Sequence, residues 1–220
     1  MSLVCQCPAS SALTTIPAVS CPENFGQIQK VAFQRLYDAN GNRNSFAGSG
    51  TPLAATIGLK ASWTALLSAA DGTKVVISPY INAPADSGGD ARMTSGGNDD
   101  LGGVPEVLGG NPVQFDGSMR SVPQSVIKAM KELQCEANAG NLGVFLFDEN
   151  GKIEAIQDKT TPTTYYPIPI RALFIGSKIH GNYEAKDSNL ISWQYPDNYS
   201  DDLAIVTPSD FNPLTDLIPA

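Results

Sequence analysis

The chain has 220 residues, 42% of them hydrophobic and 16% charged, and a formal net charge of −8 at pH 7. This excess of acids repels a nucleic-acid backbone and argues against tight nucleic-acid binding. No apolar run is long enough to span a bilayer, and the N-terminal stretch lacks the basic head and apolar core of a signal peptide, which predicts a cytoplasmic compartment with reduced thiols.

The chain length fits a single domain preceded by an extended segment. Residues 1–24 contain prolines at positions 8, 17 and 22 and no hydrophobic periodicity, so we expect an N-terminal arm there. The arm holds Cys5, Cys7 and Cys21. Residues 25–220 are expected to form one β-rich domain, because 20 glycines and 16 prolines suit short strands joined by turns and long loops.

The first half of this domain predicts a strand, a helix and a second strand. In "QIQKVAFQRLY", Val31, Phe33, Arg35 and Tyr37 share one alternating face, although a helix also fits in part. The segment 53–70 spaces its apolar residues in a nearly helical pattern and ends at an Asp-Gly pair. "TKVVISPYI" then has the composition of a buried strand.

A long glycine-rich loop is predicted at 84–118, because "ARMTSGGNDDLGGVPEVLGGN" carries three glycine pairs. It lacks the lysine followed by Ser or Thr of a P-loop, and its glycines do not join a strand directly to a helix, which argues against nucleotide binding. Four acids, Asp90, Asp99, Asp100 and Glu106, lack the spacing of an EF-hand, so solvated loop acids are favoured over a calcium site.

The second half begins with the clearest helix of the chain, at 121–138. Ser121 is expected to cap this helix and Pro123 to occupy its first turn. A hairpin follows, with strands at 144–147 and 153–156 around the turn Asn150-Gly151. Three further strand candidates lie in "YYPIPIRALFIGSKIHGNYEA", "NLISWQYPDNY" and "DLAIVTP". Together these elements predict a mainly β (α+β) fold, a β-sandwich or barrel with one flanking amphipathic helix.

No constellation of residues predicts catalysis or a cofactor. The cysteines of the N-terminal arm, with Cys135 or His180, reach the ligand count of zinc but not its usual spacing, so thiols or a disulfide formed after release are favoured. His180 is the only histidine, and no carboxylate pair stands out beside it. The sequence therefore predicts a protein that is not an enzyme and that uses no metal or cofactor.

The order of elements, together with "WTALLSAADGTKVVISPY", "GVFLFDENGKIEAI" and the ending "TPSDFNPLTDLIPA", resembles the tail tube (major tail) proteins of long-tailed bacteriophages, of the kind found in phages of Bacteroides-type gut bacteria. The resemblance implies a structural virion protein whose homo-oligomeric, hexameric rings stack into a hollow tube with other phage proteins. DNA would pass through the tube without specific binding, and no membrane would be involved.

The resemblance also implies that the glycine-rich loop is an inter-subunit loop. The loop residues to which it assigns this role are Arg92, Gly96, Gly97, Asp99, Asp100, Gly102, Gly103, Gly109 and Gly110. Two alternatives remain open at this point. One is another virion component, a capsid decoration or head-to-tail joining protein. The other is a carbohydrate-binding β-sandwich that uses Trp193, Tyr195 and Tyr199 as a sugar platform.

Overall fold

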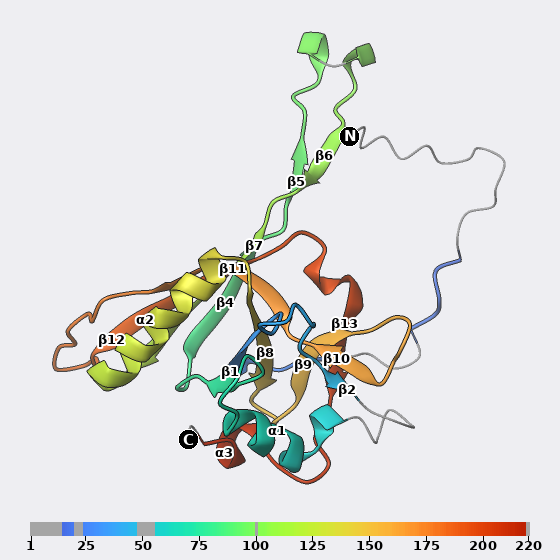
Figure 1. The fold of residues 1–220 in the computed structure, drawn as a ribbon. Helices are drawn as coiled ribbons and strands as arrows, with labels where there is room; N and C mark the ends of the chain where they lie inside the picture. Colours follow the sequence, from blue (N-terminus) through green and yellow to red (C-terminus); the bar gives the residue numbers. More distant parts are fainter. Residues whose placement is uncertain (1–14, 20–23, 48–55, 100, 219–220) are drawn as a thin grey trace. The chain divides into compact units, whose positions relative to one another are not determined.

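The computed structural model describes residues 15–19, 24–47, 56–99 and 101–218 (Figure 1). The chain divides into two compact units. The larger unit, here called the body, contains Phe25–Gly89 and Pro112–Ala220, and the smaller unit contains Met1–Asn24 and Asp90–Asn111.

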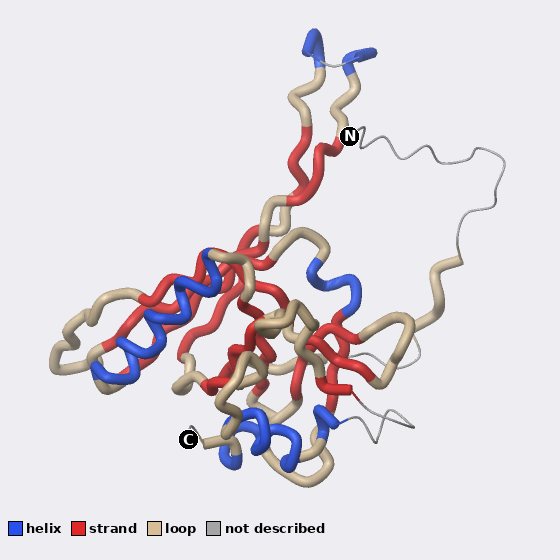
Figure 2. The backbone as a smooth tube through the Cα atoms, in the orientation of Figure 1, coloured by secondary structure: helices blue, strands red, loops and turns tan. Residues whose placement is uncertain are grey.

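The body is mainly β, as the sequence predicts (Figure 2). Its strands are β1 (Ile28–Arg35), β2 (Phe46–Ala47), β3 (Val75–Ile77), β4 (Asn82–Gly88), β7 (Val113–Arg120), β8 (Leu142–Asp148), β9 (Ile153–Gln157), β10 (Thr164–Tyr166), β11 (Ile168–Ile175), β12 (Ser188–Tyr195) and β13 (Leu203–Val206). Its helices are α1 (Lys60–Leu67), α2 (Gln124–Asn138) and α3 (Pro213–Asp216), with 3-10 turns η2 (Thr56–Gly58) and η5 (Tyr199–Asp202).

Strand β8 is the centre of an 11-stranded antiparallel sheet. One edge of β8 pairs with β1 along its whole length, while the other edge pairs first with β11 and then with β9. The sheet continues from β11 through β12 and β7 to β4. In the other direction it continues from β9 to β10 and β2, and β13 pairs with the second edge of β9. The sheet therefore has two wings that share β8.

Both faces of β8 are buried, and this creates two hydrophobic cores. Leu142, Val144 and Leu146 belong to the first core, and Phe145 and Phe147 belong to the second. The apolar run "LGVFLF" reflects this double burial, because successive side chains of a strand point to opposite faces of the sheet. The sequence identifies this strand correctly but does not by itself reveal that a core lies on each side.

The first core lies beneath α2 and holds the buried aromatic residues of the β7–β12 wing. Ile127 and Met130 of α2 pack there together with Phe115, Trp193 and Tyr195. Figure 1 shows α2 running along β11 and β12, and the amphipathic helix predicted at 121–138 is thereby confirmed. The helix nevertheless begins at Gln124, after Pro123, and no side chain caps it; Ser121 lies before it with a positive φ of 55°.

The second core lies on the opposite face of β8, beneath α1 and α3. Trp63 and Leu67 of α1 and Leu214 of α3 pack there against Phe46 and Phe145. The helical segment predicted at 53–70 therefore exists, but within the described residues it is an eight-residue helix preceded by a 3-10 turn. Positions 48–55 lie outside the described residues.

Two strands of the body lie inside the segment expected to be a loop at 84–118. Most of β4 and most of β7 fall there, so only the part between them leaves the sheet. In β7, Phe115, Gly117 and Met119 are buried and alternate with polar residues, but the central glycine and the polar partners weaken the strand pattern. Strand β4, "NAPADSG", has almost no intrinsic β-propensity and is held by pairing with β7.

Candidate assembly surfaces

The glycine-rich segment forms a β-hairpin, here called the β5–β6 hairpin (Asp90–Asn111). Strand β5 (Ala91–Met93) pairs antiparallel with β6 (Val107–Gly110). The Thr94 backbone N–H donates to the Glu106 carbonyl at 2.9 Å, and the Glu106 N–H donates to Thr94 Oγ1 at 2.9 Å. At the base, the Asn111 N–H donates to the Asp90 carbonyl at 2.8 Å. The segment therefore has regular structure of its own.

Glycine is needed where the hairpin turns. Two short 3-10 turns, η3 (Gly97–Asp99) and η4 (Leu101–Gly103), form its tip. Gly96 has φ 71°, and a Cβ atom there would lie 3.1 Å from the ring of Pro105. A larger residue at this position would be strained, because the backbone is left-handed and the Pro105 ring is close.

The predicted inter-subunit residues are spread along this hairpin. Arg92 lies on β5 opposite Gly109 of β6, and Gly110 pairs with Ala91. Gly96, Gly97, Gly102 and Gly103 all have positive φ in the tip. Asp99 ends η3, and Asp100 lies outside the described residues. Their role in contacts between copies stays a prediction.

The β5–β6 hairpin exposes large apolar side chains. Met93, Val104, Val107 and Leu108 are 45% to 65% exposed. An isolated two-stranded hairpin is at best marginally stable in water, and exposed apolar groups gain free energy when a partner covers them. The hairpin thus has the composition of a contact surface.

Of the N-terminal arm predicted at 1–24, the structure describes residues 15–19 and 24. Residues 15–19 form neither helix nor strand, and Ile16 and Val19 are largely exposed. Cys5, Cys7 and Cys21 lie outside the described residues. Cys135, on α2, is free and exposed.

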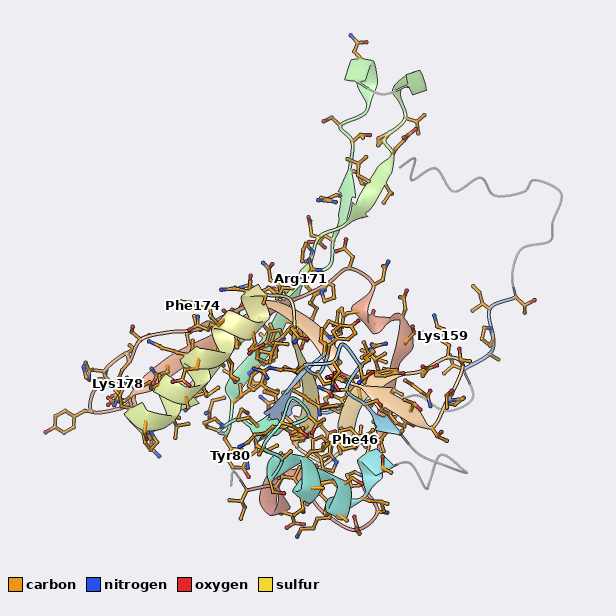
Figure 3. All side chains as sticks on the ribbon, viewed as in Figure 1. Phe46, Tyr80, Lys159, Arg171, Phe174 and Lys178 are labelled. Atoms are coloured by element: carbon orange, nitrogen blue, oxygen red, sulfur yellow. The ribbon has the colours of Figure 1, made fainter. Side chains whose placement is uncertain are left out.

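An apolar groove of about 1040 Å³ runs across the body between α2 and the β1–β3 strands. Val76 of β3 and Val126 of α2 line it and are both partly exposed. Arg35 of β1 forms an ion pair with Glu136 of α2 at the same groove. Tyr80, marked in Figure 3, also lines the groove and is 47% exposed.

The edge and outer face of the β4–β7–β12 wing are open in the described part of the chain. Strand β4 pairs with β7 along one edge only. The outer face carries half-exposed polar side chains in register, Asp116 opposite Ser192 and Gln114 opposite Gln194. Further along the wing, β11 carries Arg171 and the half-exposed Phe174, which are marked in Figure 3.

Two of the three aromatic residues considered as a sugar platform are buried. Trp193 and Tyr195 are 1% and 2% exposed, and Trp193 stacks on Phe115 at 3.9 Å between ring centroids. Tyr199 is only partly buried, and its ring stacks on Tyr195 at 4.3 Å. This corrects the carbohydrate-binding alternative, because a sugar cannot stack on rings that are inside the first core.

Candidate catalytic and metal-binding groups are dispersed in the described residues. The side chain of His180 is 85% exposed, with Nδ1 3.9 Å from Asp187 Oδ1. No three His, Cys, Asp or Glu side chains of the described residues come together in a way that could hold a metal ion. Among these residues, no helix is long and apolar enough to cross a membrane.

Comparison with known proteins finds similarity only among solved structures. No family model and no curated protein matches the chain. The tail of an empty gene transfer agent particle is 12% identical with a TM-score of 0.30, covering 59% of this chain and 82% of that chain. The virion of a native gene transfer agent particle is 12% identical with a TM-score of 0.31, covering 58% and 85%. The baseplate of the anti-feeding prophage is 10% identical with a TM-score of 0.31, covering 89% and 99%.

Proposed function

We propose that the protein is a structural virion subunit that self-assembles into stacked rings of a phage tail tube. The observation that carries this proposal is the β5–β6 hairpin, which has its own hydrogen bonds and exposes four large apolar side chains. Six copies per ring and the passage of DNA through the tube are what the resemblance to tail tube proteins implies, and they form part of the proposal.

The energetics favour a hairpin that is covered by a neighbouring copy. Full burial of one large apolar side chain contributes about 1.5 to 3 kcal/mol. Met93, Val104, Val107 and Leu108 are each 45% or more exposed, so they retain much of that gain for a partner. Exposed apolar side chains that gather on one element mark a surface for a partner.

The open edge of β4 supports lateral contacts between copies. Its second edge leaves backbone N–H and C=O groups without a strand partner in the described residues. Such an edge invites pairing with another chain. Pairing around a closed ring would satisfy these groups and leave no free edge.

The polar outer face of the β4–β7–β12 wing suits a surface that DNA passes. Gln114, Asp116, Ser118, Ser192 and Gln194 alternate with the buried residues of β7 and β12. Asp116 gives this face one negative charge and the exposed Arg120, at the end of β7 in the same alternating row, gives it one positive charge, so the face has no net charge with which to hold phosphate groups. We propose that this face lines the lumen.

Removal of the hairpin tests the proposal. The Asp90 carbonyl and the Asn111 N–H already form a hydrogen bond of 2.8 Å, so a Gly-Gly link between these two residues can replace 91–110. We expect the shortened chain to keep the thermal stability of the body and to lose stacking, as seen by negative-stain electron microscopy and sedimentation velocity. A matched control, Tyr183→Ser, removes a fully exposed aromatic side chain elsewhere and should leave stacking unchanged.

Two results would contradict the proposal. One is a wild-type chain that stays monomeric at high concentration, and the other is a shortened chain that forms tubes as readily as the wild type. Particles that stop at a single ring or a trimer would favour the capsid decoration or joining protein instead, because a tube subunit extends without a fixed length.

A further inference from the structure

The apolar groove of the body lies between α2 on one side and β3 with the residues around it on the other, and we call it the α2–β3 groove. From α2 it is lined by Val126, Ala129 and Leu133, which are three and four positions apart and therefore share one face of the helix. From the other side it is lined by Val76 of β3 and by Tyr80 (Figure 3). Val76, Val126 and Tyr80 are 36% to 47% exposed, so the groove keeps apolar surface for a partner.

The two sides of the groove carry charges of opposite sign. Lys74, directly before β3, lines the strand side, and Glu132 of α2 lines the helix side. Both are exposed, and neither forms an ion pair with another described residue. The other charged groups of the groove are held by the body itself, through an Arg35–Glu136 ion pair, a Lys30 hydrogen bond to the Leu214 carbonyl and Asp71 hydrogen bonds from Thr73. The groove therefore fits an occupant that brings apolar side chains, a carboxylate on one side and a cation on the other.

The β5–β6 hairpin presents the complementary set. Residues 104–108, "VPEVL", are all exposed and place Glu106 among apolar residues on one strand of the hairpin. Arg92 is exposed on the other strand, β5. Within the described part of the chain, neither Glu106 nor Arg92 takes part in an ion pair. The hairpin thus has exposed apolar side chains with one free carboxylate and one free cation on its two strands.

Other segments match the groove less well. Residues 1–24 contain one acid, Glu23, and no lysine or arginine, so the N-terminal arm cannot pair with charges of both signs. The loop between β11 and β12 carries Glu184 and Lys186, but its exposed large apolar side chains are only Ile179 and Tyr183, against four on the hairpin. Charge and apolar content together favour the hairpin.

We propose that the β5–β6 hairpin of one copy docks in the α2–β3 groove of a second copy, with Glu106 facing Lys74 and Arg92 facing Glu132. The contact rests on the proposed function, because stacking is what brings the hairpin to the groove of a neighbour. Burial of the apolar side chains supplies most of the affinity. The two ion pairs at the rim fix the orientation of the hairpin, because the reversed orientation would bring like charges together.

Charge reversal tests the contact. Glu106→Lys and Lys74→Glu each bring like charges together, so each variant should need a roughly tenfold higher protein concentration for half of the chains to stack. Sedimentation velocity at about 0.15 M sodium chloride measures this concentration. Both side chains are exposed, so the melting temperatures of the variants should stay near that of the wild type. The double variant Glu106→Lys/Lys74→Glu should stack as readily as the wild type.

An equimolar mixture of the two single variants separates contact between copies from contact within one copy. In a stack that alternates the two variants, every hairpin meets a groove of opposite charge, so the mixture should stack at a concentration where neither variant does alone. Rescue by the double variant without rescue by the mixture would overturn the proposal, because the hairpin would then bind the groove of its own chain. Arg92→Glu and Glu132→Arg form a second cycle with the same expected results, and its failure would overturn the proposed orientation.

The matched control is the pair Glu184→Lys and Lys186→Glu, which reverses two exposed charges of the loop between β11 and β12 and should leave stacking unchanged. Loss of stacking in this pair, with no effect of Glu106→Lys, would overturn the proposal by assigning the groove to that loop. If the wild type stacks and the variants at Glu106 and Lys74 stack equally well, the groove contact is wrong and the proposed function stands. A wild type that does not stack removes both.

Discussion

Single residues of the second core show how tightly the body is built around its aromatic side chains. Trp63 is fully buried, and its Nε1 donates a 2.7 Å hydrogen bond to the Ile57 carbonyl. Its ring lies 4.6 Å from that of Phe46 and 5.3 Å from that of Phe145, measured between centroids. Trp63 therefore links α1, η2 and the central strand through one side chain.

Truncation of Trp63 is expected to be strongly destabilising. Trp63→Ala should lower the free energy of unfolding by about 3 to 5 kcal/mol, since it leaves a large cavity. Trp63→Phe should fill most of that cavity but leave the Ile57 carbonyl without its donor, at a cost of about 1 to 3 kcal/mol. Urea denaturation measures both values, and equal losses for the two variants would show that the lost hydrogen bond, rather than the cavity, accounts for the cost.

Gly143 of β8 is fixed by crowding rather than by backbone conformation. A Cβ atom there would lie 2.7 Å from Leu36 Cδ2 and 2.8 Å from Pro167 Cβ. Gly143→Ala is therefore expected to lower the free energy of unfolding by about 1 to 3 kcal/mol in the same assay. Gly110→Ala is the matched control, because nothing lies within 4 Å of its added Cβ, and a comparable loss there would refute the crowding argument.

At the scale of elements, β11 joins the two wings of the sheet by changing partner. Its first residues pair with β8 and its last residues pair with β12, with a register shift between Arg171 and Phe174. Within this shift Ala172 has φ 51°, in the left-handed region. A bulge of this kind bends a strand and lets it leave one ladder for another.

Substitution at Ala172 tests whether the left-handed backbone conformation at this bend lowers the stability of the body. Ala172 is exposed, so a larger side chain there changes little burial. Ala172→Val should lower the melting temperature, because a β-branched residue disfavours positive φ by about 1 to 2 kcal/mol or more. Ala172→Gly should be neutral or stabilising. Thermal unfolding that ranks glycine below valine would show that the left-handed conformation is not what limits this position.

For the whole molecule, the sequence reveals most helices and strands but not which strands pair with one another in the sheet. Periodic apolar runs identify β1, β8, β9 and α2. The buried faces of these elements consist of apolar residues such as Val31, Phe33 and Ile127, and the sequence shows these directly. The sequence does not predict strand β4, because this strand forms by pairing with β7 and its own residues have no strand pattern. The hairpin at 90–111 is visible as a glycine-rich segment, but its strands are too short and too rich in glycine to predict.

The net charge of −8 makes assembly of the whole chain sensitive to salt. Copies of an acidic protein repel one another over about 10 Å at 0.1 M salt, and this range shortens to about 3 Å at 1 M. The apolar contacts proposed for the β5–β6 hairpin do not weaken under these conditions. We therefore expect the assembled fraction, measured by sedimentation velocity at fixed protein concentration, to rise between about 0.05 M and about 0.5 M sodium chloride. The Gly-Gly variant that lacks the hairpin should not stack at any salt concentration in the same range. A wild-type assembled fraction that falls with salt would show that ion pairs between copies, rather than apolar burial, hold the assembly together.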